Sequence, residues 1–430
     1  MTQRLLIYVL AGGVVMSAIL VLPLLPGGAG NLVIADLFFI FATLMFAIRA
    51  ISRPVFLGQP AKRISIFLAI FLIHAFISHI NSQIALPPNP VAIIVPLNYI
   101  YGAVISFVIL VTVQNDDDLL LLLKAWMLGG LIISVVSTLA ILGMAPSWAY
   151  HSTRISSTMN SVNQVPSYVG PAMLVMVFLP YVQEGRFWKF FAFGSLPITM
   201  IAMIATGSRT PVIMIVVIFG LAVGRAILRF NSKPLMNSGV ILFAGVMIFV
   251  LVDTLLAVLQ NAAGFLPEGL TSPLRRMIRS FLNMMQHEDT IGALGPRGEQ
   301  IAIVIDNWAD RIFLGIGPGN FEHVTGNRNE VHNTYFGLLM EHGAFGLLLF
   351  LLFIAILIFQ VLKFRGGAGQ HRMIGNLVVF VLLIILLYSA SSFGLRQRTF
   401  WIAIGLCLAH LKISMLVLKW SRLRQNNLVE

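Results

Sequence analysis

The chain has 430 residues, of which 58% are hydrophobic and only 10% are charged, and its mean hydropathy is +0.92. A soluble domain carries about 25% charged residues, so this composition excludes an ordinary soluble protein and indicates a polytopic membrane protein. The net charge of +12 comes mainly from the predicted inner loops and gives no reason to expect nucleic-acid binding.

Apolar runs follow one another along the chain, each long enough, or nearly so, to cross ~30 Å of hydrocarbon. We expect an all-α protein of about twelve transmembrane helices, near residues 5–25, 32–50, 64–81, 91–113, 119–144, 167–183, 188–206, 211–230, 238–260, 334–362, 373–392 and 399–418. The first run is too long for the apolar region of a cleavable signal peptide and is interpreted as a retained helix. Residues 1–430 are predicted to form one transmembrane helical domain.

One long outer loop, residues 261–331, is predicted to contain short helices. Its segment "TSPLRRMIRSFLNMMQ" repeats apolar residues at helical spacing, with arginines on other faces, which indicates an amphipathic helix lying on the membrane surface. The segment "GPRGEQIAIVIDNWADRIF" predicts a second helix that begins near Arg297 and ends before Gly315.

The distribution of Lys and Arg predicts cytoplasmic N- and C-termini. Ten of the 28 basic residues then face outward, and all ten are arginine: Arg154, Arg209, Arg275, Arg276, Arg279, Arg297, Arg311, Arg328, Arg396 and Arg398. The positive-inside bias does not select arginine over lysine. Because the planar guanidinium binds phosphate or carboxylate through two hydrogen bonds, an anionic substrate on the outer side is a motivated hypothesis.

Several familiar sites are excluded or disfavoured. "GIGPGNF" lacks the features of a phosphate-binding loop, and Gly315, Gly317 and Gly319 instead predict a tight turn passing close to another helix or a ligand. "NDDD" at 115–118 contains Asp-x-Asp but is interpreted as a helix cap with first-turn acids. No pattern suggests a metal ligand set, so no metal or cofactor is expected, and Cys407 is interpreted as a packing residue.

The remaining polar candidates are Arg209, Arg297, His332 and Asn333, all on the predicted outer side. An ionisable group at membrane depth is costly and is a functional candidate by default. His332 precedes a long apolar run, with Asn333 or Thr334 as the expected cap. The positive end of that helix dipole disfavours imidazolium, so we expect a neutral ring suited to general-base catalysis.

These residues resemble a known family. "GSRTP" at 207–211, "PRGEQIAIVIDNW", "GIGPGNF" and "VHNTYFGLLMEHGAFG" are similar, in order and spacing, to the O-antigen ligase and polymerase superfamily of bacterial envelope glycosyltransferases. "RISSTMNSVNQVPSYVG" resembles an earlier outer loop of the family more loosely. One departure is that the family's tryptophan soon after the loop arginine is absent near 301, and Trp308 lies later.

The resemblance implies an inverting, metal-independent transferase at the periplasmic face of the bacterial inner membrane, with an undecaprenyl-pyrophosphate-linked glycan as donor. His332 matches the family's essential histidine, and Arg209 and Arg297 match the arginines that engage the donor pyrophosphate. Arg154, Arg311, Arg328 and Asn333 are further candidates for substrate contacts. The acceptor is lipid A core for a ligase, which we favour, or a second lipid-linked glycan for a polymerase.

Two functions of other classes stay open. Outward arginines beside a membrane-edge histidine would also suit a transporter for small anions, although no matched pair of broken helices marks a transport site. A non-catalytic scaffold for envelope assembly would predict that substitutions at the candidate residues have no effect.

Overall fold

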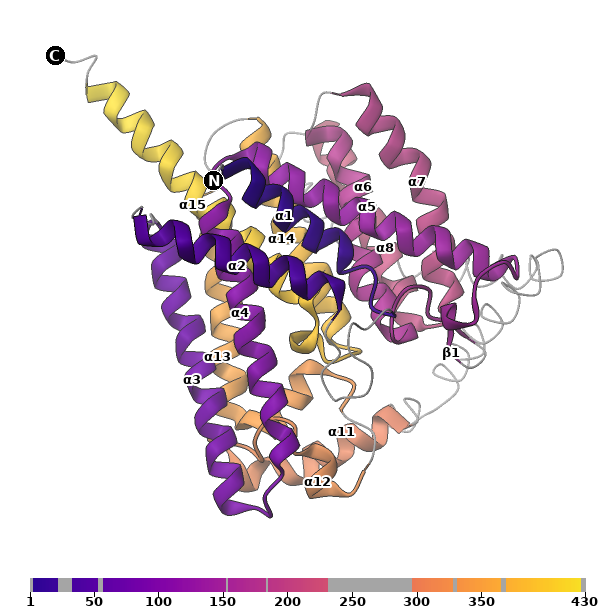
Figure 1. Ribbon diagram of the computed structural model, residues 1–430, viewed down its shortest axis with the longest axis vertical. Helices are drawn as coiled ribbons and strands as arrows, with labels where there is room; N and C mark the ends of the chain where they lie inside the picture. The colour runs from indigo at the N-terminus through magenta and orange to yellow at the C-terminus, as the bar shows by residue number, and fades with distance from the viewer. Residues whose placement is uncertain are drawn as a thin grey trace. The chain divides into compact units, whose positions relative to one another are not determined.

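A computed structural model describes residues 3–21, 33–52, 57–151, 154–182, 185–230, 296–327, 331–364 and 369–426 (Figure 1). Within these residues the chain is almost entirely helical, and its strands are the antiparallel pair β1 (Tyr150–His151) and β2 (Arg154–Ile155). Nine of the described helices are long and apolar enough to cross a membrane. The chain is therefore an all-α, multi-pass membrane protein, as the sequence predicts.

The helices follow the predicted apolar runs closely. They are α1 (Gln3–Met16), α2 (Ile34–Ser52), α3 (Gln59–Ala85), α4 (Ile94–Thr112), α5 (Asp116–Ile141), α6 (Val165–Val182), α7 (Arg186–Ala205), α8 (Arg209–Phe230), α11 (Pro296–Asn307), α12 (Phe321–Thr325), α13 (Thr334–Phe364), α14 (Gln370–Ser389) and α15 (Arg398–Asn426). Short 3-10 turns are η1 (Pro90–Ile93), η2 (Ser147–Ala149), η3 (Val162–Gln164), η5 (Trp308–Arg311) and η6 (Gly394–Arg396). The predicted helices at 238–260 and 271–286 lie outside the described residues.

The first helix is shorter than its apolar run. The sequence predicts a helix over 5–25, but α1 ends at Met16. Beyond it, the backbone N–H groups of Leu20 and Val21 donate to the carbonyl oxygen of Thr158 at 2.8 and 3.1 Å. The apolar run therefore continues past the helix, because these N–H groups bond to another segment and not to the preceding turn.

The described residues form two compact units. Unit 1 contains α1 to α4, the beginning of α5, and α11 to α15, whereas unit 2 contains the rest of α5 and α6 to α8. That the whole chain is one helical domain stays a prediction.

Unit 1 is built on close helix contacts in which α15 packs along α4 and α14, and α13 along α3 (Figure 1). A Cβ atom added to Gly102 of α4 would lie 2.2 Å from the Trp401 ring of α15, so only glycine fits there. Trp401 Nε1 donates to Leu395 O at 2.7 Å, and Ser106 Oγ donates to Trp401 O at 2.6 Å. Small residues and interhelical hydrogen bonds of this kind hold membrane helices together.

Unit 2 is centred on α6, whose side chains are almost all buried. It packs against α7 and α8. Where α6 meets α5, Gly129 lies against the Tyr168 hydroxyl and Gly130 against Ala172. Trp126 Nε1 donates to Tyr168 O at 3.1 Å, which satisfies the indole inside an apolar contact.

Unit 1 has two ends, and α14 runs from one to the other. At the end that we name the loop end, residues 86–93, 312–327, 331–333 and 390–397 meet. At the opposite end, residues 113–116 lie beside the beginning of α14. Twenty residues of helix at 1.5 Å each make α14 about 30 Å long. The predicted topology assigns the loop end to the periplasm.

Candidate functional site

The loop end is built around a break in α13. Gly343 has φ 71° and ψ 176°, which interrupts the helix. The loop after η5 pairs with this break through its backbone: Ile316 N donates to Met340 O at 3.0 Å, Gly317 N to Glu341 O at 2.9 Å and Phe345 N to Ile312 O at 3.2 Å. The loop thereby satisfies main-chain groups that the interrupted helix leaves without helical partners.

Glycines make this backbone pairing sterically possible. Gly315, Gly317 and Gly319 have φ angles of 62°, 83° and 80°, which confirms the predicted tight turn. A Cβ atom at Gly315 would lie 2.5 Å from the Glu341 backbone, and one at Gly343 would lie 2.3 Å from Ile312 O. The turn therefore requires glycine both for its φ angles and for the closeness of the two chains.

An apolar cluster docks α11 onto the beginning of α13. Its buried members are Val304, Ile316, Phe321, Val331 and Met340, with Ile303, Phe336 and Leu339 packed around them. Val304 is fully buried and Val331 is only 3% exposed. The helix that the sequence predicts inside the long loop is thus held against the residue that directly precedes His332.

His332 is fixed by its backbone and by its neighbours in the sequence. Its N–H donates to the side-chain oxygen of Gln300 in α11 at 3.2 Å. Asn333 is the predicted cap of α13, because its Oδ1 accepts from Tyr335 N at 2.9 Å and from Phe336 N at 3.2 Å. The half-buried His332 side chain therefore projects from the residue before the cap of a well-formed helix.

The next contacts tie the beginning of α13 to the α14–α15 connection. Asn333 Nδ2 donates to Ala390 O at 2.9 Å. Thr334 Oγ1 donates to Ser392 O at 2.8 Å and accepts from Gly394 N at 2.7 Å. The amide oxygen and nitrogen of Asn333 both make hydrogen bonds within the protein. A substrate contact by this side chain stays a prediction.

Arg297 lies in the first turn of α11, three residues before Gln300. Residues three apart on a helix lie on neighbouring positions of one face. The Gln300–His332 hydrogen bond therefore brings the face that carries Arg297 to the segment that carries His332. The sequence predicts Arg209, Arg297 and His332 as one site, and unit 1 contains the last two.

A buried ion pair supports the same region. Arg396 Nη2 donates to Glu341 Oε1 at 3.0 Å, and Gly319 N donates to the same oxygen at 3.1 Å. The Glu341 side chain is 3% exposed and that of Arg396 is 16% exposed. The guanidinium also lies 4.5 Å from the centre of the Phe393 ring, a cation–π contact.

A network of amides continues from this ion pair. Asn320 Nδ2 donates to Ser82 Oγ at 2.9 Å and to Ile316 O at 3.1 Å. Its Oδ1 accepts from Asn89 Nδ2 at 3.1 Å. The connection between α3 and α4 is thereby joined to the glycine turn.

A cavity of about 730 Å³ opens beside this network. It is lined by Asn89, Val91, Ala92, Ile94, Val95, Asn98, Gly319, Glu322, His323, Gly326 and Arg396. The lining offers amide donors and acceptors, a carboxylate and a guanidinium, which are the groups that bind hydroxyl-rich ligands. One face is apolar, from Val91 to Val95.

Two of the outward arginines bind carboxylates of the protein itself. Arg396 pairs with Glu341, as described, and Arg398 pairs with Asp36 through two bonds of 2.8 and 2.6 Å. Tyr101 also donates to Asp36 Oδ1. These two arginines therefore make ion pairs within the protein.

Arg209 and Arg154 belong to unit 2. Gly207, with φ 62°, ends the α7 turn, and α8 begins at Arg209. Arg154 donates from Nε and Nη2 to Thr206 O at 3.1 and 2.9 Å, so its fork holds the turn that precedes Arg209. The predicted role of Arg154 in substrate contact stays a prediction beside this structural one.

The Arg209 side chain is half-buried, and its Nη1 atom is buried without a hydrogen-bond partner among the described residues. Burial lowers the pKa of its guanidinium from the usual value. An arginine keeps its charge in proteins despite such a shift. A cationic donor thus lies at the beginning of α8, where backbone N–H groups also favour an anion.

Two further candidates are less informative. Arg311 closes η5, and its carbonyl oxygen accepts from Gly315 N at 2.9 Å. Arg328 lies outside the described residues, as do Arg275, Arg276 and Arg279. The tryptophan that the family carries soon after the loop arginine is absent near residue 301, and Trp308 is instead the first residue of η5.

A comparison with protein families gives one match. The O-antigen ligase family model matches residues 193–351. This match supports the resemblance of the chain to the O-antigen ligase and polymerase superfamily. No curated protein matches the chain.

The O-antigen ligase match includes most of α7, all of α8, α11 and α12, and α13 to a point beyond its break. It therefore contains Arg209, Arg297 and His332, but it ends before α14 and α15. Arg396 contributes to the loop end from outside the matched residues.

Three residues of the loop end were missed by sequence reasoning: Gln300, Glu341 and Arg396. Gln300 offered a signal, because a polar residue one turn after Arg297 interrupts an otherwise apolar face. Glu341 offered a signal too, because it is an acid inside an apolar run, and an ionisable group at membrane depth is a functional candidate. Arg396 had no local signal that distinguished it from the other outward arginines.

Proposed function

We propose that the chain is an inverting glycosyltransferase that moves a glycan from undecaprenyl pyrophosphate to an acceptor hydroxyl without a metal ion. The observation that carries the proposal is the hydrogen bond from His332 N to Gln300 Oε1. It supports a site in which the candidate base lies beside the helix that begins with Arg297. The match of residues 193–351 to the O-antigen ligase family model supports a transferase of this type.

His332 acts as the general base in this proposal. It takes the proton from the acceptor hydroxyl while that oxygen attacks the anomeric carbon, and the glycosidic bond to pyrophosphate breaks on the opposite side. The Asn333 cap supports this role, because it places His332 at the positive end of the α13 dipole, where a neutral ring is favoured.

Arg209 and Arg297 bind the pyrophosphate and stabilise the negative charge that grows on it as it leaves. The unpartnered, buried Nη1 atom of Arg209 supports this assignment, since a buried donor requires an acceptor and the proposed substrate supplies one. The N-terminal N–H groups of α8 favour the same anion.

The 730 Å³ cavity of the loop end is proposed to hold sugar residues. Asn89, Asn98 and Glu322 provide amide and carboxylate partners for hydroxyl groups, and the apolar segment beside them provides a surface for a pyranose face. Glycan selectivity then depends on this cavity, whereas the chemical step depends on His332 and the arginines.

The favoured acceptor is lipid A core, which makes the protein an O-antigen ligase. The alternative is a polymerase that uses a second lipid-linked glycan. In either case the protein is proposed to lie in the bacterial inner membrane, with cytoplasmic termini and a periplasmic site.

Reconstitution of the purified protein with lipid-linked donor, and with each acceptor offered separately, tests the proposal. A ligase transfers to lipid A core alone, and a polymerase extends the lipid-linked glycan alone. The His332→Ala variant is the negative control in both reactions. If neither acceptor is used and proteoliposomes instead accumulate a small anion saturably, the transporter function replaces this proposal.

A further inference from the structure

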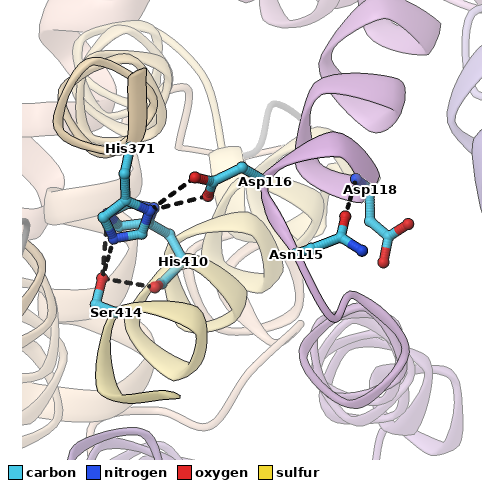
Figure 2. A network of polar contacts seen from close by, with 6 residues as sticks. All are labelled: Asn115, Asp116, Asp118, His371, His410 and Ser414. Atoms are coloured by element: carbon cyan, nitrogen blue, oxygen red, sulfur yellow. Dashed lines mark hydrogen bonds and ion pairs between the residues drawn. The ribbon is translucent and has the colours of Figure 1, made fainter. Parts of the chain in front are cut away.

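A second polar cluster lies at the opposite end of α14 from the proposed transfer site. Asp116 begins α5, His371 is the second residue of α14, and His410 lies in α15 (Figure 2). One ligand atom from each of the three lies within 4.8 Å of the other two. Asp116 and His371 are 255 positions apart in the sequence, and His371 and His410 are 39 apart, so no local motif indicates the cluster.

Ser414 determines where the two imidazoles carry their protons. Its hydroxyl donates to the carbonyl oxygen of His410 at 2.9 Å, which uses its single hydrogen. The same oxygen lies 2.9 Å from His371 Nε2 and 3.4 Å from His410 Nε2 (Figure 2). With its hydrogen placed on His410 O, this oxygen acts as the acceptor, and both imidazoles present an Nε2–H group to it.

In their neutral forms, both histidines therefore have a lone pair on Nδ1. His371 Nδ1 faces the Asp116 carboxylate at 2.9 and 3.0 Å, where two acceptors oppose each other. In this hydroxyl orientation the two acceptors need a positive charge between them, either a proton on the ring or a metal ion. With the hydroxyl turned toward His371 Nε2, a neutral ring donates from Nδ1 to Asp116 instead. The His410 side chain is fully buried, and its Nδ1 has no hydrogen-bond partner within the described part of the chain.

We propose that Asp116, His371 and His410 bind a divalent transition-metal ion, Zn²⁺, through one carboxylate oxygen and the two Nδ1 atoms. Imidazole and carboxylate are ligands that suit Zn²⁺. A tetrahedral ion at bond lengths of 2.0–2.2 Å places its ligand atoms about 3.3 Å apart. The ligand atoms lie within 4.8 Å of one another and the ring centres are 4.3 Å apart, so binding the ion requires the two stacked rings to rotate toward it.

The surroundings fit such a site. Ser414 Oγ accepts the Nε2–H groups and so serves as the outer partner that orients metal-binding histidines. The side chain of Asp116 is 26% exposed, which leaves a route for the ion and for a water as fourth ligand. Asn115 and Asp118 form the predicted helix cap instead: Asp118 N donates to Asn115 Oδ1 at 2.9 Å (Figure 2). Gln114 N also donates to Asp118 Oδ2 at 2.8 Å.

The ion would join the beginnings of α5 and α14 to α15, and its role is separate from glycan transfer. About 30 Å of α14 lies between His371 and the loop end. The metal-independent chemistry proposed at His332 is unaffected by this site.

Full-length protein, purified in detergent without a polyhistidine tag and stripped with a chelator, is titrated with Zn²⁺ against a chromophoric indicator. We expect one ion per chain, and at least tenfold weaker binding in Asp116→Asn, His371→Gln and His410→Gln. Asp117→Asn removes the neighbouring exposed carboxylate and is the matched control, which should bind as the wild type does. Ser414→Ala keeps every ligand and should weaken binding about tenfold, as outer-partner substitutions do.

Substitution with Co²⁺ gives a second readout that does not depend on stability. Visible absorption bands of a tetrahedral nitrogen and oxygen site are expected in the wild type and the Asp117→Asn variant. Equal zinc affinity in the wild type and the His371→Gln variant, or a wild type without these bands, would overturn the proposal. An imidazolium–aspartate pair would then account for the contact. Because Asp116 and His371 are partly exposed, their variants decide the matter even if His410→Gln fails to fold.

Discussion

Glu341 and Arg396 form an ion pair of 3.0 Å across two helices that the sequence separates by 55 residues. The same Glu341 oxygen accepts the N–H of Gly319, so one carboxylate joins α13, the glycine turn and the connection between α14 and α15. This joint holds α13, the helix that His332 precedes.

Removing one partner of this pair should destabilise the protein strongly. Glu341→Gln or Arg396→Met leaves the other charge buried without its counterion, which costs about 3–5 kcal/mol. The double variant should lose less than the sum of the two single losses, because its second substitution removes the uncompensated charge. Thermal unfolding in detergent measures this coupling. Strictly additive losses of stability would show that Glu341 and Arg396 have no coupling free energy.

Gly343→Ala should destabilise the break in α13. The alanine requires a positive φ, which costs about 1–2 kcal/mol, and its Cβ meets Ile312 O at 2.3 Å. Gly194→Ala is the matched control: Gly194 lies inside α7 with no atom within 4 Å of an added Cβ, so this change should stabilise the helix by about 0.5–1 kcal/mol. Unfolding temperatures that fall equally in both would contradict this account of the break.

Gln300→Leu should slow glycan transfer while leaving the fold intact. It removes the acceptor of the His332 N–H, and a donor that loses its partner costs about 1–3 kcal/mol. If the lost hydrogen bond displaces His332 and this cost adds to the activation free energy of transfer, initial rates fall roughly ten- to hundredfold. Asn307→Ala changes an exposed amide of the same helix and should transfer at the wild-type rate. Equal rates in the two variants would show that Gln300 does not position the base.

His332→Ala should abolish transfer, because a general base contributes about 10²- to 10⁴-fold. The lipid-linked donor should still bind, since the proposed pyrophosphate contacts remain. His323→Ala offers the contrast: His323 lines the cavity, with its Nε2 2.9 Å from Pro87 O, and its loss should raise KM more than it lowers kcat. Near wild-type turnover by purified His332→Ala would end the general-base assignment.

Arg209→Lys and Arg297→Lys should each lose activity although the charge is retained. A lysine places a point charge where the proposed contact uses a planar fork, and one lost transition-state donor costs about 10²- to 10³-fold. Arg186→Lys, at the exposed beginning of α7, is the control that should keep full activity. Lysine variants with unchanged donor affinity and turnover would contradict the assignment of both arginines.

The sequence predicted the helices of this protein well, because runs of about twenty apolar residues have few alternatives in a membrane. It failed where an apolar run was longer than its helix, as at α1. Local features were also predictable: the Asn333 cap and the glycine turn depend on neighbouring residues and on φ angles that few residues adopt.

Contacts between distant segments were not predictable in the same way. The Glu341–Arg396 and Asp36–Arg398 pairs depend on which helices are neighbours, and no periodicity encodes that. Asp116 illustrates the same limit: its motif predicted a cap, and neighbouring Asn115 and Asp118 form it, but only the packing of α5, α14 and α15 brings Asp116 to His371. The pairing of Arg297 with His332 required the family resemblance as well as the pattern.

The joint between residues 312–317 and the break in α13 uses main-chain atoms for its three hydrogen bonds. Its geometry therefore depends on glycines at 315 and 343 more than on the identity of the side chains around it. For engineering of the proposed glycan selectivity, these positions define a fixed frame, while Asn98 and Glu322 of the cavity lining can be randomised together.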